Sequence, residues 1–378
     1  MNRKYPAPRV VRVKGSPSEM GRQHGRQLSD LLRSYKRSIE SFNERIGLTK
    51  ERLAEIVALN EEELELNTPE LIDELRGIGE GAKMPYGDVL SMYLCPEIIS
   101  PLAVVHRGYY MEHLQECTAF AALNEATVDR LPLLAQTRDD SPEGVQFRIV
   151  VIATPRDGNS YVAHSRPTVN GGYGVNSKGV TIAAPTVHVL DSVNAINSGR
   201  PSGTTDCTLT KLVMEKCGSV DEAMKYVDSK PGGYKALNVL VVDEKGGIAK
   251  VERSYTSVKR ISEDASCPMN SVMAATNHFV SRKTRNLGPS GEKEYASSCR
   301  RYERIMELLT SEARRISLNK FKSFARDHVN GPSDLSICRH GEDTCTNSAF
   351  IAEPAKRRLH VLTGTPCQNS FVTHECPG

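Results

Sequence analysis

The stretch Cys117-Thr118-Ala119-Phe120-Ala121-Ala122-Leu123 marks a change in the character of this chain. Before it, apolar residues recur at steps of three and four, which is typical of helices. From Cys117 onward the chain consists of short apolar runs separated by turn residues, which is typical of β-strands. Strands joined by hairpins, with helices collected in blocks, predict an α+β protein with antiparallel sheets rather than alternating βαβ units. We place the functional border at Glu116/Cys117.

Residues 16 to about 84 are predicted to be helical. Ser16-Pro17-Ser18-Glu19 forms a capping box with proline at the first helical position. Thr68-Pro69-Glu70 predicts a second helix start. The apolar face of the first helix is expected to contain Leu28, Leu31, Leu32, Tyr35, Ile39, Phe42 and Ile46.

The second part of the chain alternates strands with a few helices. Predicted strands cover residues 117–123, 131–137, 147–153, 160–164, 179–183, 237–242, 248–252, 347–352 and 359–363. Predicted helices cover residues 206–217, a segment opened by Ser219-Val220-Asp221-Glu222, residues 298–309 and residues 317–328. Asn176-Ser177-Lys178-Gly179 suits a hairpin loop in which Gly179 takes a positive φ.

Composition limits the possible partners. Lys plus Arg number 49 against 46 for Asp plus Glu, and a formal charge of +3 gives no argument for nucleic acid or an anionic membrane. No window approaches the roughly 18 apolar residues that a membrane helix needs, and the start has no apolar leader. We therefore expect a soluble, cytoplasmic protein that acts on small molecules. The ten cysteines lack CxxC or paired Cys/His spacing, so no metal site is expected.

Several segments, in this order, resemble the acyl-coenzyme A:isopenicillin N acyltransferase family, whose members are N-terminal-nucleophile hydrolases. They are GSPSEMGRQHG (15–25), CTAF (117–120), QTRD (136–139), GVNSKGV (174–180), Asn238, VERS (251–254), TNHF (276–279), SICRH (336–340) and GTPC (364–367). The resemblance runs from about residue 15 to 370.

The resemblance implies a four-layer αββα sandwich of two antiparallel sheets with an N-terminal helical segment. It also implies a precursor that cuts itself between Glu116 and Cys117. Residues 1–116 and 117–378 would then remain together as a heterodimer of the chain's own fragments, in one integrated globular unit.

Cys117 is the expected nucleophile. One cysteine among ten is, on its own, most simply a buried structural thiol. A thiol with an ordinary pKa of about 8.5 needs a base, and the α-amine freed by cleavage, with a pKa of about 7.7–8.0, can be that base. The uncut chain has no such amine, so we expect it to be inactive.

The resemblance assigns two further catalytic residues. Asp139 matches the aspartate that holds the amine and the nucleophile, although Asp140 is the match if the register slips by one, and both could belong to a solvated turn. Asn277 matches an oxyanion donor, against the simpler interpretation of an asparagine that ends a strand. In this family the amine acts as base, so His278 is expected to be structural.

Arg138, Asn176 and Arg339 are candidate substrate-binding residues. Arg138 can pair with a substrate carboxylate or with a protein acid. Asn176 is explained by its hairpin, with a role in the site as the alternative. Arg339 is the nearest substitute for an arginine that the penicillin acyltransferases present in the stretch equivalent to residues 344–348.

The resulting prediction is an amidohydrolase or acyltransferase that acts on small N-acyl substrates through a Cys117 thioester. No cofactor is expected, and coenzyme A thioester stays open as an acyl donor. Glu116 stands where the penicillin acyltransferases have glycine, so cleavage is expected to be slower or differently controlled. Because residues 344–348 lack the arginine that those enzymes use for substrate, penicillin chemistry is not inherited. The alternatives are a bile-acid-amidase-like or ceramidase-like hydrolase and a non-catalytic binding protein with the same fold.

Overall fold

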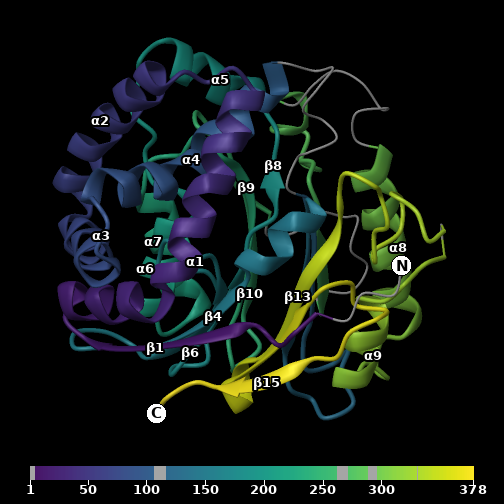
Figure 1. Ribbon diagram of the computed structural model, residues 1–378. Helices are drawn as coiled ribbons and strands as arrows, with labels where there is room; N and C mark the ends of the chain where they lie inside the picture. Colours follow the sequence, from purple (N-terminus) through teal and green to yellow (C-terminus); the bar gives the residue numbers. More distant parts are fainter. Residues whose placement is uncertain (1–4, 106–115, 262–270, 288–295, 330) are drawn as a thin grey trace.

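A computed structural model describes residues 5–105, 116–261, 271–287, 296–329 and 331–378 (Figure 1). Two sheets are packed face to face. The first contains, in spatial order, β1 (Arg9–Gly15), β4 (Ile149–Pro155), β5 (Tyr161–Ser165), β6 (Tyr173–Asn176), β7 (Thr181–Ala183), β9 (Ala236–Val242), β10 (Ile248–Arg253) and β11 (Val258–Ile261), and β8 (Thr186–Val187) also pairs with β9. The second contains β12 (Val272–Ala275), β2 (Glu116–Ala122), β3 (Leu133–Asp140), β13 (Cys345–Glu353), β14 (Arg358–Thr363) and β15 (Val372–Glu375).

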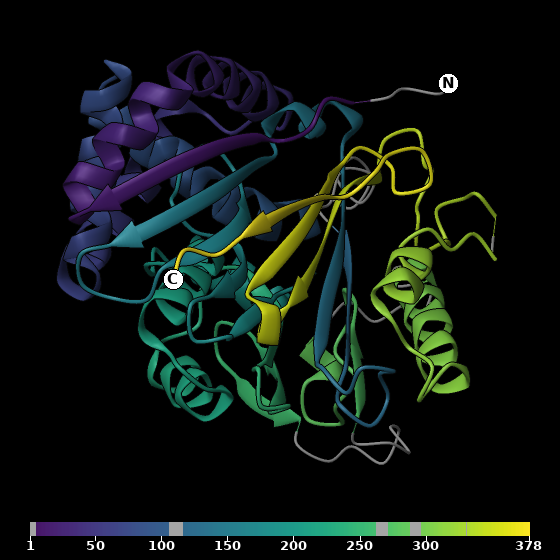
Figure 2. The same cartoon turned by 90° about the horizontal axis from the view of Figure 1, so that it is seen from below.

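Helices cover the outer side of each sheet (Figures 1 and 2). The block beside the first sheet contains α1 (Pro17–Arg45), α2 (Lys50–Asn67), α3 (Pro69–Ala82), α4 (Tyr86–Val105), α5 (Leu190–Asn197), α6 (Asp206–Lys216) and α7 (Val220–Ser229). Helices α8 (Ala296–Ser311) and α9 (Leu318–Phe324) lie beside the second sheet. The predicted α+β class and αββα sandwich are confirmed. The first sheet adds one parallel pair, β1 with β4, to its antiparallel ladders.

Local sequence signals account for many element boundaries. The predicted capping box of α1 is present, because Ser16 N–H donates to Glu19 Oε2 at 2.7 Å and Glu19 N–H donates to Ser16 Oγ at 3.4 Å. Ser219 caps α7 in a similar way, accepting from the Glu222 N–H at 3.2 Å. Gly179 has the predicted positive φ, 72°, between β6 and β7.

Some elements differ from the prediction. Strand β1 and helix α4 were not expected, and α9 ends at Phe324 instead of continuing to residue 328. The residues that follow α9 therefore form a loop. This loop brings His328 into a side-chain cluster described below.

Glycines let α1 and α3 approach closely. A Cβ on Gly21 would lie 2.1 Å from the carbonyl oxygen of Glu74, and one on Gly81 would lie 2.2 Å from that of Arg22. Such distances are too short for any side chain, so the glycines of the opening motif serve helix packing. His24, on the same helix, is buried and binds Asn170 and Pro167 O at 2.5 Å each, which fixes α1 to the loop after β5.

Strand β2 lies between β12 and β3 in the second sheet, and its side chains alternate between two cores. Ala119 and Ala121 belong to the core between the sheets, whereas Phe120 packs against Phe321 of α9 on the other face. Cys117 has the same parity as Ala119, so its side chain faces the space between the sheets. Every helix within the described residues is too short or too polar to cross a bilayer.

Candidate active site

Cys117 is the second residue of β2 and is buried, with 4% of its surface exposed. Its backbone lies opposite Arg138 of β3. Burial raises the pKa of the Cys117 thiol, Arg138 lowers it and Asp139 raises it, and the net effect is a rise. A thiol with a raised pKa is largely protonated at neutral pH, so a nearby base is required for it to act as a nucleophile.

Asn277 lies just after β12 and binds the backbone nitrogen of Cys117. The Cys117 N–H donates to Asn277 Oδ1 at 3.0 Å, and Asn277 Nδ2 donates to the carbonyl oxygen of Thr186 at 2.8 Å. The backbone N–H of Asn277 donates to Ser298 Oγ at 2.7 Å. A donor on one side and a carbonyl on the other fix the orientation of the amide. The Thr186 carbonyl occupies one of the two amide hydrogens of Asn277.

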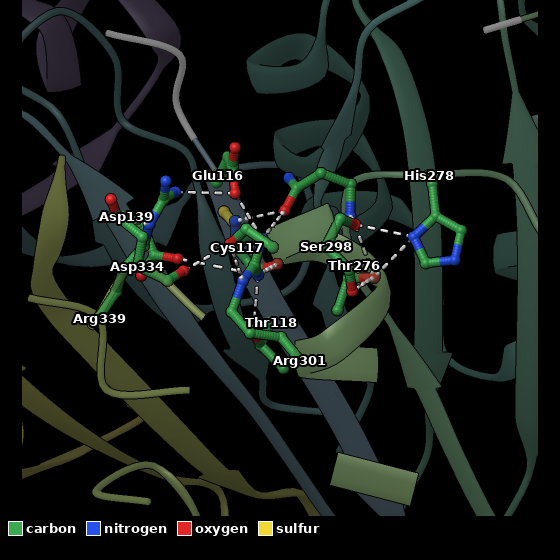
Figure 3. Close-up of polar contacts among 12 residues, drawn as sticks. Glu116, Cys117, Thr118, Asp139, Thr276, His278, Ser298, Arg301, Asp334 and Arg339 are labelled. Atoms are coloured by element: carbon green, nitrogen blue, oxygen red, sulfur yellow. Dashed lines mark hydrogen bonds and ion pairs between the residues drawn. The ribbon is translucent and has the colours of Figure 1, made fainter. Parts of the chain in front are cut away.

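Arg301 of α8 binds both residues that flank the predicted cleavage site (Figure 3). Its side chain is fully buried, and Nη1 donates to the carbonyl oxygen of Cys117 at 2.8 Å while Nη2 donates to the carboxylate of Glu116. Nη2 also donates to Asn277 Oδ1 at 3.0 Å. Arg301 therefore connects Glu116, Cys117 and Asn277 through one rigid guanidinium group.

Asp139 of β3 lies opposite Glu116 in the strand register. Its Oδ1 accepts a hydrogen bond from Thr346 Oγ1 at 2.7 Å, and its Oδ2 lies 3.8 Å from Arg301 Nη1. Burial raises the pKa of Asp139, and Arg301 opposes that rise only in part. The alternative residue, Asp140, forms an ion pair with Arg148 at 2.7 Å. The structure thus brings Asp139, and not Asp140, to the Arg301 side chain.

The Glu116 carboxylate forms ion pairs with two arginines. Arg339 Nη1 lies 2.8 Å from the same Oε2 that Arg301 binds. Burial would raise the pKa of Glu116, but Arg339 and Arg301 together hold it below its usual range. Arg339 Nε also pairs with Asp334 at 3.2 Å, so Arg339 is engaged by protein carboxylates in this state of the chain.

Arg138 and Asn176 differ in what they can offer a substrate. The Arg138 guanidinium is buried 4.8 Å from the ring centroid of Tyr173, and within the described chain its Nε has no hydrogen-bond partner. Asn176 lies away from the residues around Cys117. Its Nδ2 donates to the carbonyl oxygens of Met214 and Cys217, and its Oδ1 accepts from the backbone of Lys178 and Val180. This leaves its amide no free group for substrate, so the hairpin interpretation of Asn176 holds.

His278 lies beyond Ser298 and Thr276 as seen from Cys117 (Figure 3). Its Nδ1 is 2.8 Å from Ser298 Oγ and 3.2 Å from Thr276 Oγ1. Burial, followed by the charges of Lys250 and Arg301, lowers the pKa of His278 to about 4. The ring is therefore neutral at physiological pH and supports the Asn277 turn through Ser298.

A cavity of about 540 Å³ lies between α1 and the loop after β3. Its walls include Tyr35, Phe42, Asp140, Phe147 and Arg148. Cys117 is not among the residues that line it. Asp139 and Asn277 do not line it either, so we assign this cavity no part in the chemistry.

Neither Arg301 nor Thr346 was predicted from the sequence to be a site residue. For Arg301, the sequence contains a pattern that indicates a buried charge. Arg301, Ile305 and Leu309 follow at steps of four and are all buried, so the arginine stands on the apolar face of α8. A charged residue on such a face needs a buried partner. Thr346 leaves no comparable signal, because its partner Asp139 lies in a distant part of the sequence.

The chain matches the model of the acyl-coenzyme A:6-aminopenicillanic acid acyl-transferase family over residues 126–367. It belongs to this family. The matched residues include Asp139 and Asn277 and begin after Cys117, so the role of the cysteine depends on its geometry.

Individual similar proteins are distant. An uncharacterized protein of Archaeoglobus fulgidus is 24% identical over 254 residues, which are 63% of this chain and 41% of that protein. The chain therefore spans about two fifths of the length of this curated relative. A mutant of conjugated bile acid hydrolase from Clostridium perfringens gives a TM-score of 0.42 at 11% identity, covering 69% of this chain and 97% of its own. Penicillin V acylase from Agrobacterium tumefaciens gives 0.37 at 12% identity, covering 65% and 83%.

Proposed function

We propose that this protein is a self-processing cysteine amidohydrolase or acyltransferase of the N-terminal-nucleophile type, with Cys117 as nucleophile. One observation carries the proposal: the backbone nitrogen of Cys117 donates to the buried side chain of Asn277 at 3.0 Å. After cleavage this nitrogen would be the α-amine. Asn277 Oδ1 would then orient the amine that serves as general base.

In the processing step, Cys117 Sγ attacks the carbonyl carbon of Glu116. The bond from that carbon to the Cys117 nitrogen breaks, the nitrogen takes a proton, and a thioester links Glu116 to the thiol. Water then cleaves the thioester, which leaves a Glu116 carboxylate and a free amine on Cys117. Arg301 and Arg339, both bound to the Glu116 side chain, support this step by holding the residue before the bond in place.

In turnover, the Cys117 amine accepts the thiol proton while sulfur attacks the carbonyl carbon of an N-acyl substrate. The second amide hydrogen of Asn277 can donate to the oxygen that becomes negative. The intermediate then expels an amine that takes the proton, and the acyl group stays on sulfur until water or another amine accepts it. Asp139 pairs with Arg301, which binds the Cys117 carbonyl oxygen, and so holds the backbone of Cys117 in position.

Arg138 is the proposed contact for a negatively charged part of the substrate. It is buried beside Cys117 on the same face of the second sheet. Its Nε lacks a hydrogen-bond partner within the described chain, which is costly for a buried cation unless a ligand supplies an acceptor. A small acyl amide with a carboxylate suits this environment. A coenzyme A thioester is the alternative acyl donor.

The two fragments would remain associated after cleavage. Strand β1 belongs to the first fragment and pairs along its whole length with β4, which belongs to the second. The buried pair Glu74–Lys211, at 3.0 Å, also joins the two fragments. Cutting the chain before Cys117 would leave these contacts intact.

Intact mass measurement and N-terminal sequencing of the purified full-length chain test the proposal. We expect two associated fragments, residues 1–116 and 117–378, with Cys117 as the new N-terminus. A chain that stays uncut after long incubation, while it still hydrolyses amides, would exclude the free-amine mechanism.

A further inference from the structure

Four side chains of the types that bind metal ions lie close together near the end of the second sheet. They are His328, Cys338, His340 and Cys367, and their ligand atoms all lie within 4.8 Å of one another. The Nε2 atoms of His328 and His340 are 3.0 Å apart. The sulfur atoms of Cys338 and Cys367 each lie 3.5 Å from His340 Nε2.

These distances agree with the edges of a zinc tetrahedron. With Zn–N of about 2.0–2.1 Å and Zn–S of about 2.3 Å, tetrahedral geometry separates two nitrogens by about 3.3 Å and nitrogen from sulfur by about 3.6 Å. Without an ion, the His328 and His340 rings could share only one hydrogen between their facing nitrogens. One ion would use all four donor atoms at once.

The loops that carry the four residues are fastened to one another. The N–H of Cys338 donates to the carbonyl oxygen of Asp327 at 3.1 Å, beside His328. Arg326 Nε donates to the carbonyl oxygen of Pro366 at 2.8 Å, beside Cys367. Arg304 of α8 holds Asp327 through both carboxylate oxygens. These hydrogen bonds hold the loops, and therefore the four side chains, in fixed relative positions.

We propose that His328, Cys338, His340 and Cys367 bind one Zn²⁺ ion. Two thiolates and two imidazoles in a tetrahedron are a donor set typical of zinc. All four positions come from the protein, and a closed site of this kind is structural rather than catalytic. The proposal departs from the expectation of no metal, which depended on the absence of paired Cys/His spacing; here the ligands come from three separate loops.

The zinc site would support the candidate active site through Arg339, which lies between the ligands Cys338 and His340. Its side chain binds Glu116 at 2.8 Å, and its N–H donates to Thr346 Oγ1 at 2.8 Å. Thr346 Oγ1 in turn donates to Asp139 Oδ1 at 2.7 Å. The ion would thus fix the loop that holds both Glu116 and Asp139; this consequence rests on the proposed function, whereas the metal site does not.

Metal analysis of the full chain, purified without chelator, tests the site directly. We expect about one zinc per chain by plasma mass spectrometry. Cys367→Ser changes the exposed ligand, so it removes a metal bond with little loss of packing. Cys338→Ser changes the buried one. Both variants should lose their zinc to a competing chelator that leaves the parent loaded, and Cys376→Ser, outside the cluster, should behave as the parent.

Cobalt substitution gives a second readout. Thiolate-to-cobalt absorption should appear in the parent and in Cys376→Ser and should weaken in Cys367→Ser. Circular dichroism confirms that each variant is folded. A parent chain that takes up neither zinc nor cobalt, a Cys338–Cys367 disulfide found by mass, or a folded Cys367→Ser with parental zinc retention would each overturn the proposal. Metal content is read whether or not the chain cleaves before Cys117, so the two proposals fail separately.

Discussion

The backbone nitrogen of Cys117 lies 3.0 Å from the side-chain oxygen of Asn277, although 160 positions separate the two residues in the chain. Asn277 is held in turn by Ser298 and by the carbonyl oxygen of Thr186. The acceptor is therefore in place before any cleavage, and the amine that forms there would need no rearrangement to be oriented. Preorganisation of this kind is what general-base catalysis from a backbone amine requires.

Replacing Cys117 with alanine should abolish both cleavage and turnover, because no thiol remains to attack either bond. Cys117→Ser should cleave slowly, since a hydroxyl is a weaker nucleophile. Intact mass over time and amide hydrolysis on the same samples measure both effects. Cys299→Ser, which changes a half-buried thiol on α8, is the control. Parental hydrolysis by Cys117→Ala would place the nucleophile elsewhere.

Asn277→Ala should lower kcat by about a hundredfold to a thousandfold, because the oxyanion donor and the acceptor for the Cys117 nitrogen are lost together. The free energy of unfolding should fall by about 1–3 kcal/mol, since buried partners are left unpaired. The matched control is Asn238→Ala, which removes a buried hydrogen bond to the carbonyl of Thr276 and a partly buried one to the carbonyl of His278. If both variants lose stability and activity equally, Asn277 is structural.

Asp139→Asn and Asp140→Asn together test the register. Asp139→Asn keeps the shape and the acceptor for Thr346 but loses the charge near Arg301. We expect cleavage and turnover to fall by about a hundredfold through misplacement of the connected groups. Asp140→Asn keeps an acceptor for the Ser141 N–H but removes the charge that pairs with Arg148, and it should retain activity. The opposite pattern in rates measured on folded variants would move the catalytic role to Asp140.

Local signals predicted much of the fold. The caps at Ser16 and Ser219, the strand that starts near Cys117 and the turn at Gly179 depend on residues close in sequence, so a short window contains their cause. Strand β1 was missed because it is stabilised by parallel pairing with β4, a distant segment.

The candidate site was predictable where the resemblance named residues, and not where tertiary structure supplies the partner. Asp139 and Asn277 were named, but the connection between them passes through Arg301, on a helix to which no role was assigned from the sequence. Asn176 is the opposite case. Its motif is prominent in the sequence, yet its side-chain amide binds only backbone groups and has no part in the site. The cluster of His328 and Cys367 likewise forms only when separate loops meet.

His278→Asn should leave the pH dependence of turnover unchanged, because a group with a pKa of about 4 is already neutral across the working range. The acidic limb should instead follow the Cys117 amine. Stability behaves differently. The unfolded chain binds a proton on this histidine near pH 6.5 and the folded chain only near pH 4, so the parent loses stability as pH falls through that window. The His278→Asn variant should lose less stability than the parent over the same pH range, as measured by denaturant unfolding. A shift of the acidic limb of kcat would assign His278 to the reaction.

Arg301→Leu should have the largest effect on both folding and processing. The guanidinium is fully buried against Glu116, the Cys117 carbonyl and Asn277, and its removal leaves Glu116 with one arginine fewer in a desolvated site. Breaking a buried ion pair typically costs about 3–5 kcal/mol, and we expect a loss in that range, reduced by the remaining contact from Arg339. Its neighbour Arg300 provides the control, because its side chain is 62% exposed and Arg300→Leu removes only a surface pair with Glu303.

Arg301→Lys keeps the positive charge but loses the planar guanidinium group. It should recover part of the stability but little of the cleavage rate, since an ammonium group cannot reproduce the geometry that reaches Glu116, the Cys117 carbonyl and Asn277 together. Urea unfolding and the time course of cleavage should be recorded for all three variants. Cleavage at the parental rate in a folded Arg301→Leu would exclude a role for this arginine in positioning the scissile bond.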